Sequence, residues 1–236
     1  MKVLINSEKK RFFWKSGDLH TEEGTIKESE IKKKSSKVKT NTKKELIKFD
    51  ASFTDILTTL MSGPATISAK DAGSIIAHTG INSKSRIVDA GTGSGFLAAY
   101  LSNITDNITT YEKNKMHFNI AQKNLKKINH KIKIKNKDIT EGISEKNLNL
   151  ITIDLPTPWT ILNHIEKALV SGGFLVCYLP NINQVQQLIQ ESKKYNLILE
   201  KTLETIEREW TIQGQICRPK HQILGHTAFI VFFRKY

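Results

Sequence analysis

The segment RIVDAGTGSGF, residues 86–96, says most about how this chain folds. Its apolar start, 86–90, predicts a buried strand, and that strand enters a turn with glycine at every second position. Because glycine has no Cβ, such a turn can bend sharply and let a ligand approach the backbone closely. The spacing is Gly-x-Gly-x-Gly, whereas dinucleotide-binding proteins carry Gly-x-Gly-x-x-Gly. We therefore expect a ligand-binding turn at 91–95 and a helix that begins near Phe96.

Outward from this turn, strands alternate with helices from Lys70 to the C-terminus, which predicts the parallel sheet of an α/β domain. No helical pattern lies between 205 and 226, so the last strands are expected to form an antiparallel hairpin. The expected class is a Rossmann-like α/β fold with a mostly parallel seven-stranded sheet. Strands are predicted at 86–90, 107–112, 131–136, 148–154, 172–179, 197–205 and 226–234, and helices at 70–79, 95–103, 114–128, 158–169 and 181–194.

Residues 1–55 follow a different pattern, with short strand-like runs separated by turns. The pattern predicts a small β-barrel or sheet. Ser52 is placed to cap a short helix, and Ser62-Gly63-Pro64 ends it, so 51–64 is interpreted as a linker. The predicted domains are 1–55 and 65–236. The strand-like runs are VLIN, RFFW, GTIKESEI, KVKTNT and ELIKF.

The charge of the chain favours a polyanionic partner. The formal net charge is +13 and the pI is near 9.6, and residues 113–137 hold nine lysines and no acid. A compositional origin stays open, because 31 lysines against 5 arginines is also what an AT-rich genome encodes. Specific phosphate contacts favour arginine, whose planar fork binds with two hydrogen bonds.

The sequence also indicates where the protein resides. No apolar run approaches the roughly 18–20 residues that span a bilayer, and the N-terminus lacks the apolar region of a signal peptide. We therefore expect a soluble, cytoplasmic protein that makes no membrane contact. Cys177 and Cys217 lack the spacing of metal ligands, so no metal site is expected, and whether the two cysteines pair stays open.

Acidic residues follow three of the predicted strands. Asp89 precedes the glycine turn, Glu112 ends the next strand, and Asp138 follows the one after. Glu112 can accept hydrogen bonds from both ribose hydroxyls of an adenosine, and Asp138 from its amino group. Because no phosphate-binding P-loop accompanies them, the acids favour S-adenosylmethionine, whose sulfonium is positive, over NAD or ATP. A surface position for Glu112 and a helix N-cap for Asp138 are the structural alternatives.

The segment IDLPTPW, residues 153–159, ends the next predicted strand at the same edge of the sheet. Its two prolines stiffen the loop, and Trp159 offers a flat apolar wall. A carboxylate at Asp154, beside a methyl donor, can orient the amine of a substrate. A position in the hydrophobic core is the alternative for Trp159.

With these motifs, the chain resembles the bacterial and archaeal tRNA (adenine-N1) methyltransferases, which modify the T-loop adenine at tRNA position 58 and in some archaea also at 57. The resemblance covers almost the entire chain. The glycine turn is common to many methyltransferases, whereas the Asp154 loop and the segments YLPN (178–181) and GHTAF (225–229) are more specific. Further matching segments are LHTEEGTI (19–26), AKDAGSIIAHTGI (69–81), YEKNKMHFNIAQKNL (111–125), FLVCYLPNINQV (174–185) and RPKHQILGHTAFIVFFRK (218–235).

The resemblance implies a class I methyltransferase domain behind a small β-barrel domain, a homotetramer, S-adenosylmethionine as cofactor and tRNA as partner. Asp154 matches the acid that holds the target adenine, and Tyr178 matches a tyrosine that lines the same pocket. One departure is Ser68, where the family often has a His or Tyr. The expected cofactor-binding residues are Asp89, Gly91, Gly93, Ser94, Gly95, Phe96, Glu112, Asp138 and Asp154.

Two other functions stay open at this point. One is a methyltransferase that acts on a protein or a small metabolite, and the other is a non-catalytic RNA-binding subunit of the same fold. Cofactor binding distinguishes the second from an enzyme. The choice between tRNA positions 57 and 58 is not determined by the residues.

Overall fold

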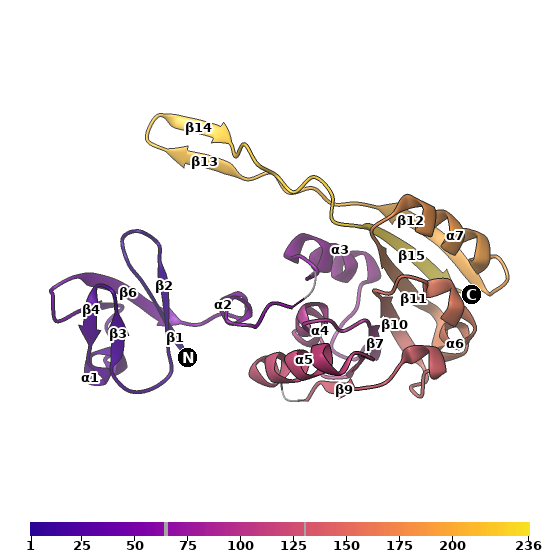
Figure 1. Cartoon of the computed structure of the whole chain (residues 1–236), viewed down its shortest axis with the longest axis horizontal. Coiled ribbons are helices and arrows are strands. Elements are labelled where there is room, and N and C mark those ends of the chain that lie inside the picture. Colours follow the sequence, from indigo (N-terminus) through magenta and orange to yellow (C-terminus); the bar gives the residue numbers. More distant parts are fainter. Residues whose placement is uncertain (64–65, 130) are drawn as a thin grey trace. The chain divides into compact units, whose positions relative to one another are not determined.

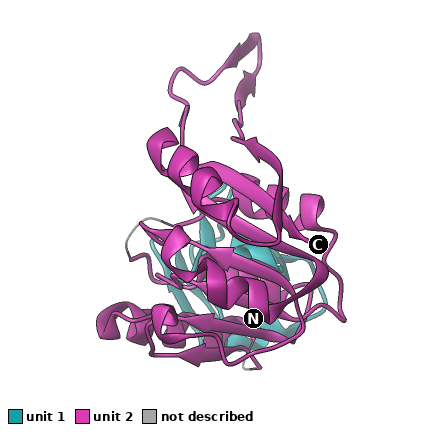
Figure 2. Ribbon diagram, turned by 90° about the vertical axis from the view of Figure 1, so that its right-hand side faces the viewer, with its two compact units in different colours: residues 1–60 teal, residues 61–236 magenta. Residues whose placement is uncertain are grey.

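The computed structural model describes residues 1–63, 66–129 and 131–236. The chain forms two compact units, Met1–Leu60 and Met61–Tyr236, which Figure 2 shows in different colours. Pro64 and Ala65, where the predicted linker ends and the second predicted domain begins, lie outside the described residues.

The first unit is built from two antiparallel sheets. The larger has the order β2-β1-β6-β5, and the smaller is the hairpin β3–β4. Apolar side chains of both sheets meet in one core, which includes Leu4, Trp14, Ile26 and Leu46. The predicted small β-rich fold is thereby confirmed. Its elements are β1 (Lys2–Ile5), β2 (Arg11–Trp14), β3 (Leu19–Thr21), β4 (Gly24–Ile26), α1 (Glu28–Lys32), β5 (Lys37–Lys39), β6 (Glu45–Asp50) and α2 (Phe53–Leu57).

One predicted strand of this unit is wrong in part. The run 24–31 was expected to be extended, but only its start is a strand, and Glu28–Lys32 is the helix α1. Lys32 forms an ion pair with Glu28, four residues before it, and Ile31 is the buried residue of the helix. This spacing favours a helical turn over an extended strand. At the end of the unit, Ser52 caps α2 as predicted.

The second unit contains a seven-stranded sheet with the order β12-β15-β11-β10-β7-β8-β9. The strands from β11 to β9 pair in parallel, and β15 is antiparallel to both β11 and β12. The predicted Rossmann-like, mostly parallel sheet is confirmed (Figure 1). Its strands are β7 (Ile87–Ala90), β8 (Ile108–Tyr111), β9 (Lys133–Lys135), β10 (Leu148–Ile153), β11 (Leu169–Leu179), β12 (Leu197–Leu203) and β15 (Phe229–Lys235).

Helices cover both sides of this sheet, which explains why β7 and β8 are buried along their whole length. Helix α4 packs against α3, α5 and β8, and α5 packs against β9, while α6 and α7 pack against β11 (Figure 1). The strand order reverses between β10 and β7, so the loops that follow these strands leave a crevice at their carboxyl ends. The helices are α3 (Ala69–Thr79), α4 (Phe96–Ser102), α5 (Lys115–Ile128), α6 (Leu162–Ala168) and α7 (Ile182–Ser192), with 3-10 turns at Ile139–Glu141 and Pro158–Ile161.

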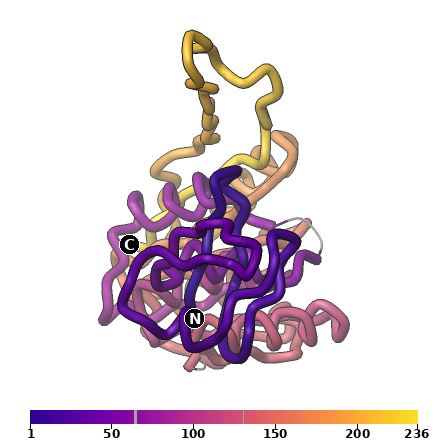
Figure 3. Tube along the Cα trace, turned by 90° about the vertical axis from the view of Figure 1, so that its left-hand side faces the viewer, coloured from indigo at the N-terminus to yellow at the C-terminus, as the bar shows by residue number. Residues whose placement is uncertain are grey.

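A long excursion, residues 204–228, connects β12 to β15. The predicted antiparallel pairing of the C-terminal strands is confirmed by β12 and β15, but the excursion adds a second hairpin that was not predicted. This hairpin, β13 (Trp210–Gln213) with β14 (Ile216–Pro219), is largely exposed and extends away from the sheet of its own unit (Figure 3). Cys217 lies on it as a free, exposed thiol, and Cys177 is free and buried in β11.

No helix in the described ranges combines the length and apolar character that a bilayer-spanning segment needs.

Candidate functional site

The glycine turn follows β7, as predicted, and its backbone conformation requires glycine. Gly91, Gly93 and Gly95 have φ angles of +88°, +55° and +87°, which residues with a Cβ rarely adopt. A Cβ on Gly91 would also collide with the carbonyl oxygen of Asp154. Gly95 ends the turn as the N-cap of α4, and Phe96 begins that helix as expected.

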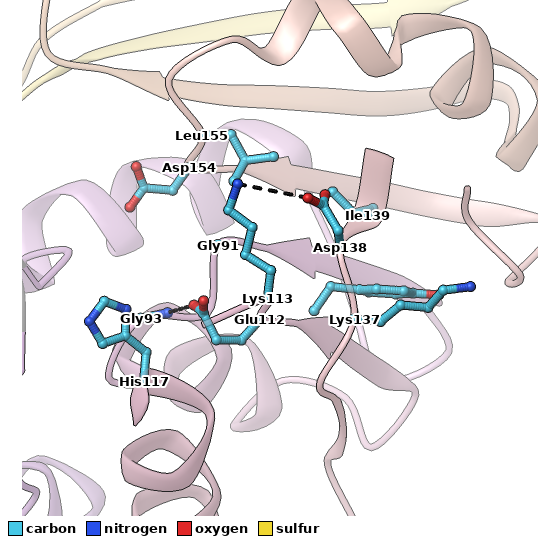
Figure 4. Close-up of a pocket in the computed structure, with 11 residues that line it drawn as sticks. Gly91, Gly93, Glu112, Lys113, His117, Lys137, Asp138, Ile139, Asp154 and Leu155 are labelled. Atoms are coloured by element: carbon cyan, nitrogen blue, oxygen red, sulfur yellow. Dashed lines mark hydrogen bonds and ion pairs between the residues drawn. The ribbon is translucent and has the colours of Figure 1, made fainter. Parts of the chain in front are cut away.

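A cavity of about 270 Å³ opens beside this turn (Figure 4). The loops after β7, β8, β9 and β10 form its walls, because the carboxyl ends of these parallel strands meet at one edge of the sheet. The predicted site residues in its lining are Gly91, Gly93, Glu112, Asp138 and Asp154. The structure therefore brings together side chains that are up to 63 residues apart in the sequence.

Glu112 is held rigidly at the wall of the cavity. One carboxylate oxygen accepts a hydrogen bond of 2.9 Å from the backbone N–H of Gly93, and the other accepts one of 2.8 Å from Asn114 (Figure 4). The amide of Asn136 donates to the carbonyl oxygen of Glu112 at 2.8 Å. Glu112 is buried, so the surface alternative is wrong, and its carboxylate ties the glycine turn to the end of β8.

Asp138 is the N-cap that was considered as its structural alternative, and it also lines the cavity. It caps the 3-10 turn at Ile139–Glu141 by accepting hydrogen bonds from the backbone N–H and the hydroxyl of Thr140, at 2.9 and 2.8 Å. These bonds, with the nearby charge of Lys113, lower the pKa of Asp138. Lys113 extends along the cavity, and its Nζ lies 3.7 Å from Asp138 (Figure 4). The capped carboxylate is therefore ionised and fixed in direction.

Asp154 differs from the other acids of the cavity. Its backbone N–H donates to the carbonyl oxygen of Ala90 at 2.8 Å, which fixes its position beside the glycine turn. Within the described ranges, no donor or cation contacts its carboxylate. Burial, followed by the negative charges of Asp89 and Glu112, raises the pKa of Asp154 to about 7. This carboxylate is thus available to a ligand, and a positive charge near it would favour its ionised form.

Asp89 lies beneath the glycine turn and does not line the cavity. Its carboxylate accepts hydrogen bonds of 2.7 Å from the hydroxyls of Thr110 and Thr152, which belong to the two neighbouring strands. Asp89 is only 2% exposed, and burial raises its pKa despite these two bonds. In this position it ties β8, β7 and β10 together and contributes negative charge behind Asp154.

A second, narrow pocket lies on the other side of the turn and includes Ser94 and Phe96. The hydroxyl of Ser94 is buried, and no partner for it is found among the residues that the structure describes. A buried hydroxyl without a hydrogen bond costs about 1–3 kcal/mol. The hydroxyl lies next to Gly63, where an added Cβ would collide with it.

Tyr178 and Ser68 meet at a buried acid that sequence reasoning did not single out. Tyr178, at the end of β11, donates a hydrogen bond of 2.9 Å to the carboxylate of Asp71, in the first turn of α3. Ser68 is the N-cap of α3, and its hydroxyl donates to the same carboxylate at 3.0 Å. The segment AKDAG places Asp71 early in a predicted helix, but the complete burial of Asp71 could not be predicted from the helical pattern alone.

The proline-rich loop has a structural role beside its predicted one. Trp159 packs against the hydrophobic core of the second unit and is not part of the cavity wall, so the core alternative is confirmed for it. Gln184 donates a hydrogen bond of 2.9 Å to the carbonyl oxygen of Pro156, which fastens the loop to α7. In the described part of the chain, no group of three or more His, Cys, Asp or Glu side chains could hold a metal ion.

Comparisons with known proteins agree with this geometry. A family model described as the tRNA methyltransferase complex GCD14 subunit matches residues 64–217. The chain is 33% identical over 211 residues to the tRNA (adenine(57)-N(1)/adenine(58)-N(1))-methyltransferase TrmI of Methanocaldococcus jannaschii, a match that covers 76% of this chain and 75% of that protein.

Two solved structures are similar over both units. The tRNA (m1A58) methyltransferase TrmI of Aquifex aeolicus has a TM-score of 0.81 and 28% identity, covering 100% of this chain and 96% of that one. A SAM-dependent O-methyltransferase of Thermotoga maritima has a TM-score of 0.85 and 26% identity, covering 99% and 92%.

Proposed function

The chain belongs to the GCD14 family of tRNA methyltransferases, and we propose that it transfers a methyl group from S-adenosylmethionine to N1 of the T-loop adenine at tRNA position 58. The relative from Methanocaldococcus is named for positions 57 and 58, and the Aquifex protein for 58, so 58 is the target that they share. The observation that carries the proposal is the Asp154 carboxylate, which faces the cavity without a protein partner in the described ranges, beside Glu112 and Asp138.

The cavity fits the cofactor in charge and in shape. Glu112 and Asp138 would accept hydrogen bonds from the ribose hydroxyls and the adenine amino group, and the glycine turn leaves the close approach that a Cβ would block. Ser94 and Phe96 would line the part of the site on the other side of the turn, where the remainder of the cofactor would be held. Gly95 and Asp89 would support the turn from below rather than touch the ligand.

The residues act mainly by positioning. When bound, S-adenosylmethionine supplies a methyl group on a positively charged sulfur. N1 of adenine carries a lone pair, so the protein need not remove a proton from it before attack. Asp154 would accept a hydrogen bond from the exocyclic amine of the adenine, which orients N1 and stabilises the positive charge that develops on the base. Tyr178 would form part of the wall against which the adenine is held.

The tRNA would be bound through the basic surface of the protein. Four of the nine lysines in 113–137 form ion pairs with acids of the same unit. Lys123 and Lys126 are exposed on α5 and leave positive charge for phosphates. Since the target base lies in the folded tRNA elbow, it must be turned out of its stack to reach Asp154.

Three further properties belong to the same proposal. The protein would bind RNA directly, act in the cytoplasm where tRNA is processed, and assemble into a homotetramer. The exposed apolar side chains of the β13–β14 hairpin, Trp210, Ile212 and Ile216, offer a surface for that assembly. Its test is the molar mass of the protein by light scattering.

The decisive experiment is methyl transfer from labelled S-adenosylmethionine to unmodified tRNA transcripts, followed by nucleoside analysis. We expect 1-methyladenosine, and its loss when the T-loop adenine is replaced. The Asp154→Ala variant should lower kcat about 100-fold. Cofactor binding without tRNA methylation would refute the substrate assignment and direct attention to a hydroxyl acceptor, as in the Thermotoga relative. Absence of cofactor binding would refute the enzymatic function.

A further inference from the structure

The carboxylate of Asp71 is the centre of a buried polar cluster in the second unit. Asp71 is completely buried, and its side chain accepts hydrogen bonds from several side chains that come from separate parts of the chain. Lys70 Nζ lies 2.8 Å from one carboxylate oxygen, and the Lys70 side chain is itself only 7% exposed. The other donors are the hydroxyls of Ser68, Tyr178, Thr205 and Thr227.

The charge of Asp71 is stabilised in this environment. Burial alone would raise its pKa, but the hydrogen bonds from Lys70, Thr205, Thr227 and Tyr178 outweigh burial and lower it. Tyr178 behaves in the opposite way, because burial and the negative charges of Asp71 and Asp154 raise its pKa. Tyr178 therefore stays protonated and donates to an ionised Asp71, and Asp154 is close enough to affect it.

The same cluster holds both ends of the excursion 204–228. Thr205 lies just after β12 and Thr227 just before β15, and both donate to Asp71, Thr227 at 2.8 Å. Lys70 donates to the same two hydroxyls, at 3.2 and 2.7 Å. Between these two threonines, β13 and β14 pair only with each other, so the cluster is the base from which the hairpin extends (Figure 3).

A second contact reinforces this base, from the residues directly before the two threonines. The ring nitrogens of His226 lie 2.8 Å from the Glu204 carboxylate and 3.0 Å from the carbonyl oxygen of Pro180. Both partners accept hydrogen bonds, so a protonated imidazole satisfies both, and the bond to Glu204 raises the pKa of His226. This contact joins the ends of the excursion to the loop that follows Tyr178.

We infer that Asp71 is a positioning residue for methyl transfer, which acts by fixing the Tyr178 hydroxyl and the base of the 204–228 excursion beside the adenine pocket. The inference rests on the proposed function, because that function places Tyr178 at the target base. A hydroxyl held by an ionised, buried carboxylate has one preferred direction, and the tyrosine ring is held with it. Without the hydrogen bonds to Asp71, the tyrosine ring and the excursion can move relative to Asp154. Small misplacements of this kind lower kcat.

The test compares the full-length protein with Asp71→Asn, Tyr178→Phe and the double variant, with Thr202→Val as the control. Thr202 is an exposed strand threonine outside the cluster. We expect Asp71→Asn to lower kcat on unmodified tRNA about 10- to 100-fold, with the KM for tRNA and the Kd for S-adenosylmethionine changed less than about threefold. The double variant should lose no more kcat than Asp71→Asn alone, because both changes break one interaction. An unchanged kcat in Asp71→Asn, or losses that multiply in the double variant, would overturn the inference.

Hydrogen exchange supplies a readout that needs no tRNA. We expect the backbone amides of 206–226 and 178–181 to exchange at least about tenfold faster in Asp71→Asn than in the wild type, and those of β7 and β8 to stay unchanged. If the wild type methylates no tRNA, the proposed function fails, and this exchange result alone decides whether Asp71 holds the excursion and Tyr178. Should Asp71→Asn not fold, the variant Thr205→Val/Thr227→Val, which keeps the Lys70–Asp71 pair, must show the faster exchange at 206–226. Exchange equal to the wild type in that variant would overturn the inference.

Discussion

The carboxylate of Asp154, which has no partner among the described residues, should make cofactor affinity depend on pH in a predictable way. In the protein alone the pKa of Asp154 is about 7, against an ordinary value of 3.8, because the group is buried beside Asp89 and Glu112. The sulfonium of S-adenosylmethionine is positive, whereas the sulfur of the product S-adenosylhomocysteine is neutral. Only the substrate form should therefore favour the ionised state of Asp154 strongly.

The size of the effect follows from the two pKa values. If bound S-adenosylmethionine returns the pKa of Asp154 to its ordinary range, binding at pH 6 releases about 0.9 proton, and affinity rises about tenfold between pH 6 and pH 8. The affinity of S-adenosylhomocysteine should change less than about threefold over the same range. In Asp154→Asn the affinity for S-adenosylmethionine should fall, and its dependence on pH should match that of the product.

The assay is isothermal titration calorimetry of both ligands at pH 6, 7 and 8, in two buffers that differ in ionisation enthalpy, which counts the protons released. The wild type and Asp154→Asn are measured side by side. Parallel changes in the two affinities, or a pH-dependent difference that persists in Asp154→Asn, would refute the assignment of Asp154 as the carboxylate beside the sulfonium.

The raised pKa of Asp154 should also make the stability of the ligand-free protein depend on pH, in a direction that can be worked out. Since the pKa of Asp154 is raised on folding, its ionisation favours the unfolded chain. Below about pH 3 the group is mostly neutral in both states and contributes almost nothing, and stability is lost as the pH rises from about 3 to 7. Asp154→Asn should therefore stabilise the ligand-free protein by as much as about 4 kcal/mol at pH 8. At about pH 3 the variant and the wild type should have nearly the same urea midpoint, and a gain there as large as at pH 8 would contradict the argument.

Three further outcomes are expected. Gly91→Ala should abolish S-adenosylmethionine binding and lower the free energy of unfolding by about 2 kcal/mol or more, because Gly91 has a φ of +88° and a Cβ there would collide with the Asp154 carbonyl oxygen. The control is Gly73→Ala, which adds a Cβ in open space on α3 and should keep cofactor binding. Thr152→Val removes a donor from the buried Asp89 and should cost about 1–3 kcal/mol in urea unfolding, and a neutral result would mean that Asp89 is protonated and needs only one partner. The tRNA affinity should fall at least about tenfold between 50 and 200 mM salt in a filter-binding assay, whereas a flat response would exclude phosphate contacts as its source.

Local chemistry made the core of the site predictable. A turn with alternate glycines can be recognised because only glycine adopts its positive φ angles without strain, as Gly91 and Gly93 do here. Acids that directly follow parallel strands must come together at one edge, which is why Glu112, Asp138 and Asp154 line one cavity. These features depend on residues that are neighbours in the sequence, or on the regular geometry of a parallel sheet.

The features that escaped prediction depend on packing between distant segments. Residues 28–32 form a helix whose Ile31 enters a core shared with β1 and β6, and this burial could not be predicted from the local pattern. Asp89 was predicted to bind the cofactor, yet it is buried beneath the turn, where two threonines on neighbouring strands donate to its carboxylate.

Sequence position established which acids surround the cavity, whereas tertiary structure established how each one behaves. Asp154 titrates near neutrality because folding removes water from it and places two negative charges nearby, and Asp71 stays ionised because folding surrounds it with donors from four segments of the chain. Both effects arise from desolvation and from groups that are partly distant in the sequence, such as Asp89 for Asp154 and Thr205 for Asp71. The identity of a side chain is local information, but its charge state in the folded protein is set by everything that packs against it.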